Sequence, residues 1–120
     1  MINLMKPPLE LRRGFKDEKH LKKVRELLCI VCEKDKQISP TVAHHLWGGG
    51  AGMKASDLLS FPLCNFHHTG SFDGHKVGQS IHYGLKEFEK NYGTQKELIS
   101  LTYEKLGLSE KWESIKEYIK

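Results

Sequence analysis

The chain has 120 residues, of which 38% are hydrophobic and 28% are charged, and its formal net charge is +4. This composition is typical of one folded domain and excludes an intrinsically disordered chain. No apolar run approaches the roughly 20 residues of a membrane-spanning helix, and no secretory signal is recognisable at the start. We therefore expect a cytoplasmic protein without a membrane partner, and the small positive charge favours a polyanionic partner only weakly.

The first segment contains the dipeptide Pro7-Pro8 and the basic pair Arg12-Arg13. Adjacent prolines disfavour a helix and favour an extended segment. Two interpretations remain open for residues 1–14. They form either a disordered terminus or a basic extended arm that lies along a phosphate backbone.

The next elements are predicted from periodicity and end signals. Asp17 is a candidate N-cap for a helix over residues 17–28, in which apolar residues recur at helical spacing. Two short strands follow over residues 41–47 and 61–64, where β-branched or apolar residues lead into histidine or cysteine. Residues 65–78 are expected to begin as a short helix or turn and then to become irregular.

Three helices are predicted in the last third of the chain, because Thr94 and Ser109 are candidate N-caps and Gly93 and Gly107 are candidate stop signals. Their expected spans are 85–91, 95–106 and 110–120. We expect a single domain made of three regions. These are the arm 1–14, a core over 15–93, and C-terminal helices over 94–120 that pack on the core.

Metal-ligating side chains are concentrated in the middle of the chain, since all three cysteines and six of the seven histidines lie between positions 29 and 82. An odd number of cysteines without an export signal favours thiolate–metal ligation over disulfides. The pairs Cys29-x2-Cys32 and Cys64-x2-His67 each supply half of a tetrahedral zinc site, so we predict a structural Zn²⁺ here. The alternative is a buried or redox-active Cys-x-x-Cys pair, which would lack the usual βαβ context.

Within positions 29–82, five histidines remain outside this zinc site: His44, His45, His68, His75 and His82. Neutral imidazole is a common metal ligand and a natural general base near pH 7. Adjacent residues of a strand point to opposite sides, so His44 is predicted to bind a metal while His45 faces a water molecule. This division suits phosphodiester hydrolysis, in which a divalent ion stabilises developing charge and a histidine deprotonates water.

Residues 48–52 read Gly-Gly-Gly-Ala-Gly and separate His45 from Asp57. Taken alone, they would be a floppy surface loop. In this position, we predict that the backbone at Gly49 and Gly50 approaches a phosphate and that Lys54 adds a positive charge there.

Four segments in this order resemble the HNH endonucleases of the ββα-metal class, and among these the Ref-like phage recombination-associated nucleases. They are Cys29-x2-Cys32, the run AHHLWGGGAGMKASD at 43–57, the run PLCNFHH at 62–68 and the run IHYGLKEFEKNYG at 81–93. The resemblance covers about half to two thirds of the chain. It implies an α+β fold with a small ββα-metal core that is stapled by zinc and surrounded by helices.

The resemblance also implies roles for individual residues. His45 matches the general base, while His44 and His68 match positions that bind the catalytic metal. His82 is similar to a further ligand from the helical part. Asp57 stands near the position of the central asparagine of the family, so this chain has an aspartate where the family has an asparagine. An aspartate there could orient the loop and the base, or it could bind metal.

Two histidines fit the family pattern less well. His67 stands where many relatives have a zinc-binding cysteine, so His67 and His68 could exchange roles between the two metals. His75 matches no family position.

The resemblance implies a metal-dependent DNA endonuclease with His45, Asp57 and His44 as catalytic residues, and with a second divalent ion (Mg²⁺, Mn²⁺ or Zn²⁺) beside the structural zinc. It also implies a phage gene expressed in a bacterial host cell, with DNA and a RecA filament as candidate partners. The alternative is a non-catalytic zinc-stabilised module that binds nucleic acid or protein, which would leave the remaining histidines unexplained. RNA cleavage would use the same chemistry, so the sequence does not distinguish the two substrates.

Overall fold

A computed structural model describes residues 7–32, 41–47, 54–69 and 77–119. The elements in chain order are η1 (Leu9–Leu11), α1 (Glu18–Arg25), β1 (Thr41–His45), β2 (Ser60–Cys64), α2 (Asn65–His68), α3 (Leu85–Tyr92), α4 (Gln95–Lys105), α5 (Ser109–Ile115) and η2 (Lys116–Tyr118). The predicted α+β class is confirmed, because helices accompany a two-stranded sheet in the described part of the chain. Among the described residues, no helix has the length and apolar character needed to cross a membrane.

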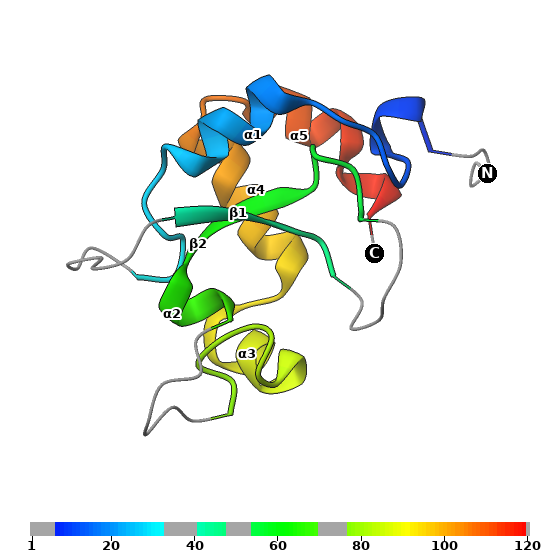
Figure 1. Cartoon of the computed structure of the whole chain (residues 1–120). Helices are drawn as coiled ribbons and strands as arrows, with labels where there is room; N and C mark the ends of the chain where they lie inside the picture. The colour runs from blue at the N-terminus through cyan, green and yellow to red at the C-terminus, as the bar shows by residue number, and fades with distance from the viewer. Residues whose placement is uncertain (1–6, 33–40, 48–53, 70–76, 120) are drawn as a thin grey trace.

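The sheet is an antiparallel pair at the centre of the domain, in which Thr41 of β1 lies opposite Cys64 of β2 and His45 lies opposite Ser60. All five residues of β2 are buried. Figure 1 shows α4 crossing behind the sheet, α1 above it, and α2 following directly from β2. Because β2 is buried along its whole length, it holds the start of α2, and the ligands on α2, in a fixed position.

Helix α1 begins after Asp17, whose side chain accepts a hydrogen bond from the backbone N–H of His20 at 3.0 Å, as the capping prediction required. The prediction that this helix continues to Leu28 is wrong, because it ends at Arg25. The chain then turns toward the sheet, where the N–H of Ile30 donates to the carbonyl of Pro62 at 2.9 Å. This turn brings Cys29 beside β2.

The prediction of an extended or disordered arm is wrong for residues 7–14, because Leu9–Leu11 forms a 3-10 turn. Leu11 is buried in the core. The N–H of Gly14 donates to the carbonyl of Lys54 at 2.9 Å. These contacts tie the segment to the domain, while residues 1–6 lie outside the described part of the chain.

The C-terminal helices follow their predicted order with one correction. Thr94 caps α4 through a reciprocal capping box with Glu97, and Gly93, with φ of +112°, ends α3. Ser109 is not the N-cap of α5, because it is already helical and Leu108 occupies the cap position. The last helix is also shorter than predicted, since it ends at Ile115 and a 3-10 turn follows.

Tyr103 connects α4 to the segment before β2, because its hydroxyl donates to the carbonyl of Leu58 at 2.7 Å in a buried position. Burial raises the pKa of Tyr103, so the hydroxyl remains a donor at neutral pH. We expect Tyr103→Phe to lower the free energy of unfolding by about 1–3 kcal/mol, because the Leu58 carbonyl would lose this donor while still buried. Urea denaturation would measure this loss. Tyr118→Phe is the control, since Tyr118 is 44% exposed; an equal loss in both variants would contradict the prediction.

Candidate metal centres

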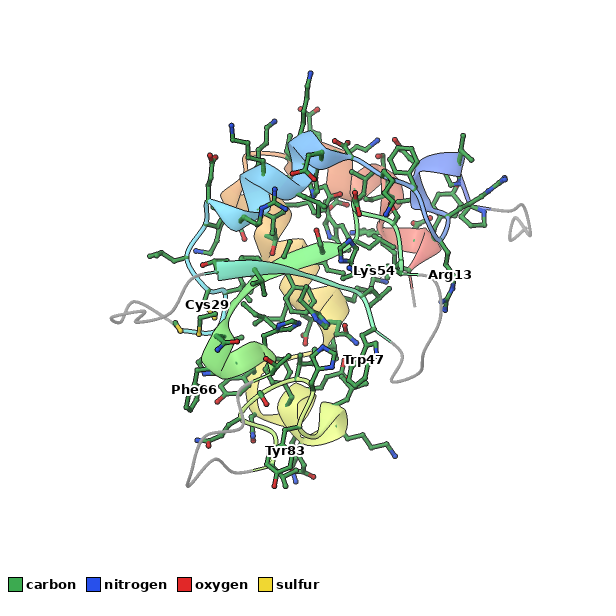
Figure 2. The ribbon with its side chains drawn as sticks, in the orientation of Figure 1. Arg13, Cys29, Trp47, Lys54, Phe66 and Tyr83 are labelled. Atoms are coloured by element: carbon green, nitrogen blue, oxygen red, sulfur yellow. The ribbon has the colours of Figure 1, made fainter. Side chains whose placement is uncertain are left out.

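Four ligand atoms from three segments converge beside the sheet, all within 4.8 Å of one another: those of Cys29, Cys32, Cys64 and His67. Cys64 ends β2, His67 lies in α2, and the other two lie in the turn after α1. Figure 2 shows this group on the flank marked by the Cys29 label, where the sulfur atoms gather. The turn after α1 therefore supplies one half of the site, and the junction between β2 and α2 supplies the other half.

The spacing of these atoms fits a tetrahedral ion. The sulfur atoms of Cys32 and Cys64 lie 3.6 Å apart, and the Nδ1 atom of His67 lies 3.4 Å from Cys64 Sγ and 3.7 Å from Cys29 Sγ. Ligands at the corners of a zinc tetrahedron with bonds of about 2.0–2.3 Å are about 3.3–3.8 Å apart. These four residues could therefore hold one metal ion such as zinc.

The electrostatics of this group also favour a cation. Burial raises the pKa of the Cys29 thiol. Burial likewise raises the pKa of Cys32, and its neighbours Cys29 and Cys64 act in the same direction. Thiolates so close together in a buried site repel one another, and a divalent cation removes that repulsion.

A second group consists of three histidines whose ligand atoms also lie within 4.8 Å of one another: His44 of β1, His68 of α2 and His82. Their ring centroids are separated by 5.1 Å, 5.3 Å and 4.8 Å. The N–H of His82 donates to the carbonyl of His68 at 3.1 Å, which holds the segment before α3 against α2. Residues far apart in the sequence are thus fixed around one point.

The three histidines are arranged to remain neutral. Burial, with the nearby His68 and His82, lowers the pKa of His44 to about 3. Burial and His82 lower the pKa of His68 to about 4. The Nε2 atom of His44 is buried and has no hydrogen-bond partner among the described residues. An unpaired buried nitrogen is costly, and a metal ion at the centre of the group would satisfy it.

His45 lies next to His44 on β1 but faces a different partner. Its Nε2 atom lies 2.7 Å from Oδ1 of Asp57, and the other oxygen of Asp57 accepts the backbone N–H of Asp17 at 2.7 Å. Burial would raise the pKa of Asp57, but the hydrogen bonds from Asp17 and His45 outweigh burial and lower it. An ionised carboxylate only accepts, so in the neutral His45 ring the tautomer that fits has its proton on Nε2 and its lone pair on Nδ1.

The remaining predicted residues divide into four sets. Arg12, Arg13 and Lys54 are exposed, and Figure 2 shows Arg13 and Lys54 on the same flank of the molecule. Asp57 belongs to neither metal group among the described residues. The structure places His67 with the cysteines and His68 with the other histidines. The predictions for Gly49 and Gly50, and the unassigned His75, lie outside the described residues.

Two residues beside the histidine group were not identified from the sequence. The Trp47 ring packs on the His82 ring with centroids 4.3 Å apart, and Gln95 is buried at the start of α4. A glutamine in the first turn of a helix carries no signal of its own, because polar residues are common there. Trp47 directly precedes the glycine-rich residues 48–52. The unusual composition of those residues was the sequence signal that pointed to this part of the chain.

Comparison with known proteins gives a family but no activity. Residues 3–107 match the family described as "Protein of unknown function (DUF968)". The chain is 35% identical over 94 residues to "Uncharacterized protein YdfU" of Escherichia coli (strain K12), a match that covers 76% of this chain. The chain spans only 23% of the length of that relative. No solved structure matches the chain.

Proposed function

The chain belongs to the DUF968 family of proteins of unknown function, and we propose that it is a metal-dependent endonuclease of the ββα-metal (HNH) type that hydrolyses phosphodiester bonds of DNA. One observation carries this proposal. Adjacent residues of β1 serve two different groups, since His44 joins the three-histidine group while His45 pairs with Asp57. The packing of a protein core does not by itself require a set of metal-binding side chains beside a histidine that can accept a proton.

The three-histidine group fits a divalent ion, because its members are neutral nitrogen donors and the Nε2 atom of His44 is buried without a partner. When bound, such an ion supplies Lewis-acid stabilisation of the negative charge on the phosphate and the leaving oxygen. The order β1, β2 and α2, with histidines on β1 and α2, supports the resemblance to the ββα-metal class. The Cys29, Cys32, Cys64 and His67 group would hold the structural zinc.

His45 is the proposed general base, and its contact with Asp57 supports Nδ1 as the atom that acts. Since Asp57 engages the Nε2 atom, Nδ1 is the nitrogen that takes the proton from the attacking water. The carboxylate of Asp57 then lies beside the imidazolium that forms and stabilises it. The backbone N–H of Asp17 holds Asp57 in place. Asp57 therefore acts in this proposal by orienting the base, not by binding metal.

DNA is the proposed substrate for reasons of charge and resemblance. Arg12, Arg13 and Lys54 are exposed cations. Figure 2 shows Arg13 and Lys54 on one side of the domain, where they could bind the phosphates that flank the cleaved bond. A phage recombination setting, a bacterial cytoplasm and a RecA filament as partner rest on the resemblance to Ref-like nucleases alone. They extend the proposal and are not needed for the chemistry.

Cleavage of supercoiled plasmid by the zinc-loaded protein, with and without added Mg²⁺ or Mn²⁺, tests this function. We expect nicked or linear DNA only when the added ion is present. His44→Ala should lower the rate by at least about 100-fold, because an ion contributes several kcal/mol to catalysis and each 1.4 kcal/mol is tenfold. The variant should still contain one zinc per chain. If the wild-type protein carries its second ion and binds DNA without cutting it, the proposal fails and a zinc-stabilised binding module is favoured.

A further inference from the structure

Gln95 joins the start of α4 to the residues that surround the histidine group. Its side-chain oxygen accepts the backbone N–H of Trp47 at 2.9 Å, and its side-chain nitrogen donates to the carbonyl of Trp47 at 2.6 Å. Its own backbone N–H donates to Oε2 of Glu89 in α3 at 3.0 Å. Gln95 is only 5% exposed. Its side chain and backbone together form a buried clamp, which connects α3 and α4 to the segment that follows β1.

The same side chain lies near His44. Burial lowers the pKa of His44, and the nearby Gln95 side chain acts in the opposite direction. The Nε2 atom of His44 is buried without a hydrogen-bond partner among the described residues. Gln95 therefore lies beside one histidine of the group while it holds the backbone of Trp47.

Trp47 extends the clamp to a second histidine. Its indole packs against the His82 ring at 4.3 Å between centroids. His82 is the most exposed member of the three-histidine group, and so it depends most on a neighbour to fix its ring. Through Trp47, Gln95 acts on the ring of His82.

We propose that Gln95 is a positioning residue for the three-histidine metal site, because it holds the backbone of Trp47 and, through the Trp47 indole, the ring of His82. This inference rests on the metal site of the proposed function and deepens it. It also assigns a role in the site to the C-terminal helices, which the sequence indicates only as packing. Partners that orient metal-binding histidines typically change metal affinity by about 10- to 100-fold when removed.

Mn²⁺ titration of the zinc-loaded protein, followed by electron paramagnetic resonance, tests this role, because Mn²⁺ does not displace zinc from thiolates. Gln95→Met keeps the length of the side chain but removes both hydrogen-bonding groups. We expect it to raise the Mn²⁺ dissociation constant by about 10- to 100-fold with zinc content unchanged. Gln95→Glu retains an acceptor oxygen for the Trp47 N–H, so its dissociation constant should lie closer to the wild-type value than to that of Gln95→Met.

Thr102→Val is the matched control, because Thr102 is a fully buried α4 residue whose hydroxyl donates to the Leu98 carbonyl at 2.8 Å. It should lose some stability without losing Mn²⁺ affinity. If Gln95→Met binds Mn²⁺ as tightly as the wild type, the proposal is overturned. It is also overturned if Thr102→Val loses as much affinity, because the effect of Gln95 would then be one of general stability.

The Mn²⁺ titration also separates this inference from the proposed function. If the wild type binds no Mn²⁺, the proposed function fails at its metal site, and the positioning role fails with it. If the wild type binds Mn²⁺ and Gln95→Met binds it equally well, only the positioning role fails.

Discussion

Replacing His45 with glutamine should lower the rate of metal-dependent DNA cleavage by about 100- to 10,000-fold, the usual contribution of a general base. The glutamine amide can still donate a hydrogen bond to Asp57, so the local structure is expected to remain. It has no nitrogen that accepts a proton near neutral pH, so the attacking water would keep its proton. Initial rates of plasmid nicking at saturating Mg²⁺ or Mn²⁺ measure this effect.

The controls for His45→Gln separate chemistry from binding. The variant should bind DNA with wild-type affinity in a gel-shift assay and should contain the same amounts of zinc and Mn²⁺. Glu113→Gln, at an exposed position on α5, should cleave DNA at the wild-type rate after identical purification. If His45→Gln retains its metals and cuts DNA as fast as the wild type, His45 is not the base.

Cys64→Ser should remove the zinc and leave most of the chain unfolded at 37 °C. The Cys29, Cys32, Cys64 and His67 group joins the turn after α1 to β2 and α2, so its loss releases three segments at once. Structural zinc contributes about 10–16 kcal/mol of apparent binding free energy in zinc-finger peptides, which exceeds the net stability of a typical small domain. Zinc quantification and thermal unfolding by circular dichroism measure the effect.

Ile99→Val is the control for general core damage, because Ile99 is fully buried in α4. It should cost only about 0.5–1.5 kcal/mol and should leave zinc binding intact. Removal of zinc from the wild-type protein by a chelator should reproduce the unfolding of Cys64→Ser, and added zinc should reverse it only in the wild type. A Cys64→Ser protein that melts at the wild-type temperature would show that the group is not a structural metal site.

The elements that sequence reasoning located are those with strong local signals. Asp17 and Thr94 cap their helices through hydrogen bonds to residues three positions ahead, so the whole signal lies within one turn of sequence. The strands of the hairpin were placed by their apolar residues and by the ligands at their ends. Cys29 and Cys32, and likewise Cys64 and His67, are close in sequence, so each half of the zinc site was visible before the structure was known.

What sequence reasoning missed depends on contacts between distant residues. Pro7-Pro8 suggested an extended arm, but the burial of Leu11 decides the conformation of that segment. The hydrogen bond of Asp57 to His45 spans twelve positions, and no local pattern distinguishes an orienting carboxylate from a metal ligand. Gln95 is still more remote, because it meets Trp47 across 48 positions. Such partners are fixed by how α4 packs on the sheet.

The central claim is that one chain holds two metal ions in two kinds of site, and anomalous diffraction from crystals of zinc-loaded protein soaked in Mn²⁺ tests it most directly. Elemental analysis of the same preparation gives the stoichiometry. The account predicts zinc bound by Cys29, Cys32, Cys64 and His67, and manganese bound by His44, His68 and His82. A single zinc, with no manganese signal among the three histidines, would contradict it.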